Sequence, residues 1–182
     1  MQENLKQMTD YLSLISNCSN RGLMISEIIL KNISDGKISD DNFVQLSIAD
    51  IVKSALNEYA FTSNDEKSLI YTDLKDDFNF TGDETLMIFV LFNLLKNSLC
   101  YKANIKISLD SKHKHLYFKD DGIGIDENKL PFVFDDFFTS NKKGGTGLGL
   151  PFCKRIMQAF GGDIRIKSIK GKGVEFCLKF TD

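Results

Sequence analysis

Apolar side chains recur at helical spacing through the first 34 residues of the chain. Steps of three, four and seven residues separate Leu5, Met8, Leu12, Ile15, Cys18, Ile25 and Ile29. This spacing predicts one long helix with an apolar stripe over residues 1–34. One helix cannot bury such a stripe by itself, so we expect it to pack on the following domain, on a partner chain or on a further helix. The turn-rich segment SDGKISDDN is predicted to end the helix.

From Phe43 onward the apolar positions fall in short alternating runs, which predict strands and helices in turn. Strands are expected at 43–48, 68–74, 77–82, 104–110, 115–121, 163–169 and 173–180, and helices at 49–61, 83–101 and 151–160. Most of these strands follow one another as hairpins and not as repeated βαβ units. We therefore predict an α+β fold, a two-layer α/β sandwich, and not a Rossmann sheet.

The composition narrows the classes of function. Of the 182 residues, 42% are hydrophobic and 26% charged, and the formal net charge is −2 without a stripe of Lys or Arg, which argues against nucleic-acid binding. No apolar run approaches the length of a membrane span, and the N-terminus MQENLKQMTD is too polar for a signal peptide. The 4 cysteines form no C-x-x-C pair, which predicts buried, reduced thiols in a cytoplasmic chain, while a full-length protein could still be anchored to a membrane.

A glycine-rich segment, GGTGLGLPFCKRIMQAFGG, covers residues 144–162. Pro151 suits the first turn of a helix, and Gly161 suits the position just after a helix end. Between them, Phe152, Ile156 and Phe160 recur at helical spacing. The segment thus predicts a flexible loop that presents free N–H groups at a helix N-terminus, which is suited to an anion. An ordinary glycine-rich connection is the alternative.

Two amides lie on one face of the predicted helix DETLMIFVLFNLLKNSLCY. Asn93 and Asn97 are four residues apart, and Tyr101 lies one turn further along. Amides on an apolar helix are costly unless they are satisfied, so they either bond to neighbouring loops or serve a ligand. Their carbonyl oxygens are ligands that Mg²⁺ accepts beside phosphate oxygens and water.

Two further segments carry candidate chemistry. In KDDGIGI, Asp120 ends a strand where a carboxylate could accept from an exocyclic amino group, and Gly122 and Gly124 would let a flat ring approach the backbone. The alternative is a simple strand-to-loop turn. The segment FVFDDFFTSNKK predicts a mobile flap with the aromatic side chains of Phe134, Phe137 and Phe138. Its last two residues are Lys142 and Lys143, which either neutralise a triphosphate or remain solvated.

The order of these motifs is more specific than any one of them. NLLKNS, DDGIGI, FDDFF and GTGLGL follow one another, and from Phe43 to about Phe180 the chain resembles the ATP-binding domain of the GHKL superfamily, in its sensor histidine-kinase branch. The resemblance implies the Bergerat α/β sandwich and a 43–182 ATP-binding catalytic domain. The GLPFCKRIM stretch is similar to bacterial quorum-sensing hybrid kinases.

The resemblance also implies a binding site for ATP and Mg²⁺. Asn93 and Asn97 would hold the metal and the phosphates, with Asn93 as the catalytic positioning group, while Tyr101 packs on adenine. Asp120 would bond the adenine amino group. The remaining nucleotide-binding positions implied by the family motifs are Gly122, Gly124, Ile125, Phe138, Lys142, Lys143, Gly145, Thr146, Gly147, Leu148, Gly149 and Leu150.

One position separates the branches of this superfamily, and two others depart from the kinase pattern. The ATPases and the anti-sigma type serine kinases carry a Glu four residues before the second Asn, where this chain has Asn93, so transfer to a histidine fits better than hydrolysis. Cys100 stands where many kinases have Lys or Arg, with Lys102 displaced, and Val174 stands where Thr or Ser often occurs. These departures motivate an alternative: a degenerate, non-catalytic docking module for another kinase or a response regulator.

The phosphoacceptor histidine of the family is missing. Residues 1–36 are similar to the second helix of a dimerisation and phosphotransfer domain, but the H-E-x-x-N/T-P string of the first helix is absent. Both histidines, His113 and His115, lie in DSKHKH, a predicted hairpin tip without acidic partners, where they would be solvated rather than metal-bound. Either the chain is a fragment, which we favour, or its acceptor belongs to another protein. The implied partners are a phosphoacceptor histidine domain, a response regulator or receiver domain, and a second copy paired through residues 1–34.

Overall fold

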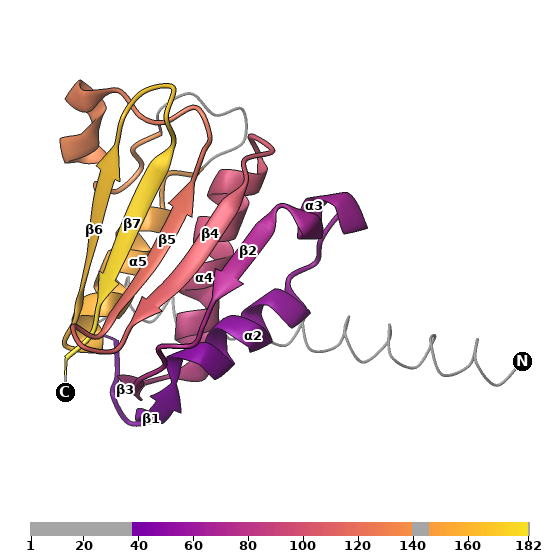
Figure 1. Cartoon of the computed structure of the whole chain (residues 1–182). Helices are drawn as coiled ribbons and strands as arrows, with labels where there is room; N and C mark the ends of the chain where they lie inside the picture. Colours follow the sequence, from indigo (N-terminus) through magenta and orange to yellow (C-terminus); the bar gives the residue numbers. More distant parts are fainter. Residues whose placement is uncertain (1–37, 140–145, 182) are drawn as a thin grey trace, which may run out of the picture.

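The structure, a computed structural model, describes residues 38–139 and 146–181 (Figure 1). The predicted helix over residues 1–34 lies outside the described residues. So do three of the predicted site residues, Lys142, Lys143 and Gly145.

A five-stranded sheet forms one layer of the fold, in the order β2-β4-β5-β7-β6. Its strands are β2 (Ile70–Asp73), β4 (Ile105–Asp110), β5 (His115–Asp120), β6 (Asp163–Ser168) and β7 (Val174–Lys179). The neighbouring pairs are antiparallel except for β2 and β4, which run parallel with Ile70 opposite Ile105. Two further strands, β1 (Val44–Ser47) and β3 (Asn79–Gly82), pair antiparallel as a small separate sheet.

All seven predicted strands are present, but the hairpin-dominated connectivity holds for only part of the sheet. The β4–β5 and β6–β7 connections are hairpins, as predicted. The chain instead passes from β2 to the parallel β4 through β3 and a long helix, because parallel neighbours need a crossover connection. The predicted α+β sandwich is confirmed.

Helices form the second layer. Helices α4 (Glu84–Leu99) and α5 (Gly149–Ala159) lie behind the sheet in the view of Figure 1, and α2 (Ile48–Glu58) packs on α4. Alternate residues of β4 and β5 are buried against this layer, among them Ile107 and Phe118. Nine residues of α4 are buried, because this helix lies between α2, α5 and the sheet.

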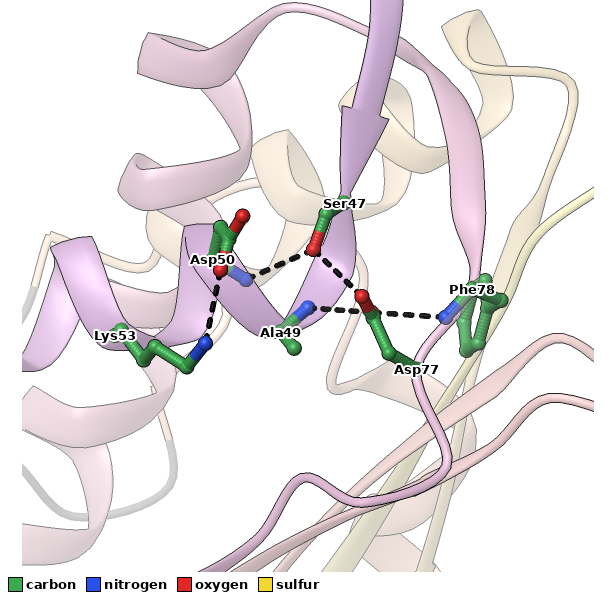
Figure 2. A network of polar contacts seen from close by, with 6 residues as sticks. All are labelled: Ser47, Ala49, Asp50, Lys53, Asp77 and Phe78. Atoms are coloured by element: carbon green, nitrogen blue, oxygen red, sulfur yellow. Dashed lines mark hydrogen bonds and ion pairs between the residues drawn. The ribbon is translucent and has the colours of Figure 1, made fainter.

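Helix α2 begins one residue earlier than predicted because two side chains cap its first turn. Ser47 Oγ accepts from the Asp50 N–H at 3.1 Å, and Asp77 Oδ1 accepts from the N–H groups of Ala49 and Phe78 at 2.9 and 2.8 Å. Figure 2 shows how Ser47 also donates to Asp77 and so joins the two caps. This network ties α2 to the segment before β3, at the end of the molecule where the small sheet lies.

Two short elements were not predicted. Helix α3 (Asn64–Ser68) is started by a reciprocal cap, in which Ser63 accepts from the Glu66 N–H at 3.2 Å and Glu66 accepts from the Thr62 N–H at 2.6 Å. The string SNDE is a capping-box signature that could have indicated this helix. The second element is a 3₁₀ turn, η1 (Glu127–Phe132), which is too short to leave an apolar period.

Two predictions about side chains need correction. Cys153 is buried, which raises the pKa of its thiol, but Cys177 is only half-buried, and Cys100, the residue that follows α4, is exposed. His113 does have an acidic partner, since its Nδ1 lies 2.8 Å from Asp110 Oδ2 in the β4–β5 turn. Within the described ranges, no three His, Cys, Asp or Glu side chains are grouped to hold a metal.

Candidate functional site

The predicted site residues converge at the end of the sheet opposite the small β1–β3 sheet (Figure 1). Here the C-terminal half of α4, the end of β5, the loop after it, the β6–β7 turn and the start of α5 come together. Elements far apart in sequence therefore bring the predicted motifs into one region.

Asp120 is the buried carboxylate of this region and accepts three hydrogen bonds. It is the last residue of β5 and only 6% exposed, yet it is a carboxylate. Oδ1 accepts from the main-chain N–H groups of Gly122 at 3.0 Å and Val174 at 3.1 Å. Oδ2 accepts from the hydroxyl of Ser98, on α4, at 2.6 Å. A buried charge needs such donors, and they fix the carboxylate in one orientation.

The loop after Asp120 is held at both ends by side chains. Asp121 accepts from the main-chain and side-chain N–H groups of Asn104 at 2.7 and 2.8 Å, and these hydrogen bonds lower the pKa of Asp121 below its ordinary value. Ser168 accepts from the Ile125 N–H at 2.8 Å and donates to the carbonyl of Gly173 at 2.8 Å. The loop therefore keeps one shape beside the buried carboxylate.

Both predicted glycines of this loop are at close backbone approaches. A Cβ on Gly122 would lie 3.0 Å from Asp120 Oδ1, and one on Gly124 would lie 2.1 Å from the carbonyl oxygen of Ile169. These contacts are with the chain itself, since Gly122 lies against Asp120 and Gly124 lets the loop pass closely over the β6–β7 turn. That the two glycines admit a flat ring stays a prediction.

Asn93 contacts the start of α5. Its Nδ2 donates to the carbonyl of Phe89 at 2.9 Å, which leaves Oδ1 as the acceptor that faces Gly149, the first residue of α5. Asn97 is half-buried one turn further along α4, and Tyr101 follows the helix end with 39% of its surface exposed. Partial burial raises the pKa of the Tyr101 hydroxyl.

Helix α5 begins without a side-chain cap. Leu148 is its N-cap residue and makes no capping hydrogen bond, and no acidic residue lies in the first turn. Pro151, in that turn, has no N–H to satisfy, whereas Gly149 and Leu150 carry N–H groups that no capping side chain takes. Such a helix start is suited to bind an anion, as the glycine-rich sequence predicts.

The segment that precedes α5 is closed by a contact between Phe137 and Gly147. The Phe137 N–H donates to the Gly147 carbonyl at 3.0 Å, and both residues have positive φ, 65° and 71°. A Cβ on Gly147 would lie 2.4 Å from the Phe137 carbonyl carbon, so only glycine fits there. Phe138 is half-buried, with its ring 6.1 Å from that of Phe132, and Thr146 Oγ1 accepts from the Leu148 N–H at 3.5 Å.

Charged side chains join this segment to α5. Arg155 donates to Asp136 at 2.5 Å, and Lys154 lies 5.3 Å from the centre of the Phe134 ring. The aromatic segment predicted as a flap is therefore attached to α5 through Phe134 and Asp136, the residues before and after Asp135.

Sequence reasoning missed three residues that shape the site: Ser98, Asn104 and Ser168. All three are small polar residues that make hydrogen bonds in the site: Ser98 donates to Asp120, Asn104 donates to Asp121, and Ser168 accepts from the Ile125 N–H. Of these, only Ser98 left a signal, because a hydroxyl stood among the apolar residues of a predicted helix. The two histidines lie elsewhere: His115 begins β5 and Asp120 ends it, so roughly 17 Å of extended strand separates them.

The chain matches the family described as histidine kinase-, DNA gyrase B- and HSP90-like ATPase over residues 82–182. Over 159 residues it is 35% identical to the CAI-1 autoinducer sensor kinase/phosphatase CqsS of Vibrio cholerae, which covers 85% of this chain and 23% of that protein. It is 38% identical over 167 residues to the autoinducer 1 sensor kinase/phosphatase LuxN of Vibrio campbellii, covering 88% of this chain and 20% of that protein. The chain thus spans less than a quarter of the length of either relative.

A solved structure agrees with the fold. The catalytic domain of histidine kinase ThkA is 26% identical to the chain and aligns with a TM-score of 0.63, covering 76% of this chain and 97% of that domain. Within the described residues, none of the helices combines the length and the apolarity that crossing a membrane requires.

Proposed function

The chain belongs to the family of histidine kinase-, DNA gyrase B- and HSP90-like ATPases, and we propose that it binds Mg·ATP and transfers the γ-phosphate to a histidine outside its own sequence. It is a catalytic domain of the sensor histidine-kinase type, as its similarity to named sensor kinases indicates. The observation that carries the proposal is that a buried, oriented carboxylate, Asp120 at the end of β5, lies at the same end of the sheet as the uncapped start of α5 at Gly149.

The base would bind at Asp120. Its Oδ1 already accepts two main-chain hydrogen bonds and its Oδ2 accepts one, so Oδ2 retains the capacity for one further donor. An exocyclic amino group of adenine supplies such a donor. Tyr101, which is partly exposed beside this region, would cover the ring.

The phosphates would bind at the start of α5. The N–H groups of Gly149 and Leu150 and the positive end of the helix dipole favour negative charge there. Thr146, Gly147 and Leu148 lead directly into this turn. They would approach the phosphates with main-chain atoms.

The amides of α4 fit a magnesium ion that is shared with the nucleotide. Asn93 keeps Oδ1 available because its Nδ2 is bonded to Phe89, and Asn97 adds an amide on the same helix face. Amide oxygens are hard ligands that suit Mg²⁺ together with phosphate oxygens and water. The ion, when bound, neutralises charge on the transferred phosphoryl group.

Transfer is favoured over hydrolysis by the identity of residue 93. An amide has no basicity to activate water, whereas the ATPases of this superfamily carry Glu at this position. Positioning and charge stabilisation, which this domain can supply, are most of what phosphoryl transfer requires from the protein. The acceptor histidine would come from a phosphotransfer domain, and a response regulator or receiver domain would take the phosphoryl group next.

A phosphotransfer assay tests the proposal. The chain would be incubated with γ-labelled ATP, Mg²⁺ and a separately supplied phosphoacceptor domain of a histidine kinase, with the Asn97→Ala variant as the control. We expect acid-labile, alkali-stable label on the acceptor domain with the wild-type chain, and little label with the variant. A folded chain that binds no nucleotide and labels no acceptor would instead support the docking-module alternative.

A further inference from the structure

Ser98 stands out among the buried residues. In the parts of the chain that the structure describes, two polar or charged side chains are fully buried, Ser98 at 2% and Asp120 at 6% exposure, and they are bonded to each other. Ser98 lies on α4 between the amide of Asn97 and the buried Leu99. A buried hydroxyl is costly unless it is bonded, so its pairing with a buried carboxylate indicates a specific role.

The hydrogen bonds assign separate tasks to the two carboxylate oxygens. Oδ1 is fully used by the main-chain N–H groups of Gly122 and Val174. Oδ2 has one protein donor, the Ser98 hydroxyl at 2.6 Å. A carboxylate oxygen has two lone pairs, so Ser98 takes one and leaves the second in a fixed direction.

Residue 174, on the neighbouring strand β7, brings no hydroxyl to Asp120. The family pattern often has Thr or Ser at this position, which would bring a hydroxyl from β7. Val174 offers Asp120 only its N–H, at 3.1 Å, so β7 contributes a main-chain donor here. Ser98 supplies the side-chain hydroxyl from the helical layer, on α4.

We propose that Ser98 is a positioning residue for base recognition, which holds Asp120 Oδ2 so that its remaining lone pair faces an amino group on the nucleobase. This inference rests on the proposed function. The Ser98 hydroxyl donates its only proton to Asp120, so the pair presents acceptors alone to a ligand. A base with an amino group at this edge is therefore bound, and one with a carbonyl oxygen there is rejected.

The test compares nucleotides that differ at this one group. ATP carries an amino group where ITP carries a carbonyl oxygen, and calorimetry with Mg²⁺ gives the ratio of their affinities. We expect Ser98→Ala to weaken ATP binding about tenfold and ITP binding by less than about twofold, because a freed Oδ2 rotates or takes up water. The wild-type preference for ATP should then fall by about fivefold or more.

A matched variant separates positioning from stability. Ser47→Ala removes the cap of α2 at the other end of the molecule, so it lowers stability without contact with the site. It should leave the ATP-to-ITP ratio unchanged. Ser98→Cys keeps the shape of the side chain, with a somewhat larger atom and a weaker donor, so it should give an intermediate ratio. It serves as the test variant if Ser98→Ala does not fold.

The outcomes are distinguishable. If the wild-type chain prefers ATP and the folded Ser98 variants keep the same ratio, this inference is overturned while the proposed function stands. If Ser47→Ala lowers the ratio as much as Ser98→Ala, the effect is structural and the inference is also overturned. If the folded wild-type chain binds neither nucleotide, the proposed function itself fails.

Discussion

The amide of Asn93 lies so close to Gly149 that a Cβ on that glycine would be 2.4 Å from Asn93 Oδ1. This contact joins the middle of α4 to the first residue of α5, and thereby joins the predicted metal ligand to the predicted phosphate site. It gives the glycine a role that does not depend on backbone freedom, because Gly149 lies in a helix.

The first prediction uses this contact. Gly149→Ala should destabilise the chain, because the new methyl group displaces the Asn93 amide. In an Asn93→Ala background the same change should stabilise by up to about 1 kcal/mol, since alanine is a better helix former than glycine. Chemical denaturation of the four chains measures both effects. If Gly149→Ala changes the free energy of unfolding by the same amount in both backgrounds, the contact between Asn93 and Gly149 does not contribute to stability.

The second prediction concerns Phe137, which is 74% exposed and has φ of 65°. A left-handed conformation disfavours any residue with a Cβ, so Phe137→Gly should be more stable than Phe137→Ala by about 1 kcal/mol. At most positions the alanine variant would be the more stable of the two, because glycine loses more conformational freedom on folding. Denaturation midpoints of the two variants decide it, and a more stable alanine variant would contradict the geometry at the Phe137–Gly147 contact.

The third prediction concerns Asp120→Asn, which places a hydrogen-bond donor where the base site has an acceptor. In Asp120→Asn, the amide oxygen can keep the main-chain donors of Gly122 and Val174, while the amide nitrogen donates to Ser98 and to the ligand. We expect this variant to fold, to lose ATP affinity by more than about tenfold and to bind ITP better relative to ATP than the wild-type chain does. Calorimetry with both nucleotides measures the change, and an unaltered preference for ATP would place the base elsewhere.

The fourth prediction follows from the lowered pKa of Asp121. Asn104 donates to this carboxylate from its main chain and its side chain, so the pKa is lower in the folded than in the unfolded state. The resulting stabilisation is present above the ordinary Asp pKa of about 3.9 and is lost as the pH falls through the lowered value. Asn104→Ala removes the side-chain donor, so the Asp121 pKa should rise towards its ordinary value.

An NMR titration of the Asp121 carboxyl measures this shift directly. Lys53, which is paired with the distant Asp50, provides a control, since Lys53→Ala should alter the titration of Asp50 and leave Asp121 unchanged. An Asp121 pKa that is the same with and without Asn104 would mean that this pair does not fix the loop.

Much of the fold and the centre of the site were predictable because their signals are local. The alternation of apolar and polar residues indicated the strands, and the spacing of the glycines indicated the start of α5. Asp83 indicated the start of α4, where its side chain accepts from the Leu86 N–H. The parallel pairing of β2 with β4 was not predicted, since register between distant strands leaves no local pattern. Ser98 and Asn104 were missed for a similar reason: each acts on a carboxylate 17 or more residues away.

The binding of Mg·ATP is measured by calorimetric titration of the chain with ATP, with and without Mg²⁺ and beside the Asn97→Ala variant. We expect ATP binding that magnesium strengthens in the wild-type chain, and loss of that magnesium dependence in the variant. A wild-type chain that is folded, as judged by a cooperative thermal transition, and that binds no ATP even with Mg²⁺ would contradict this expectation.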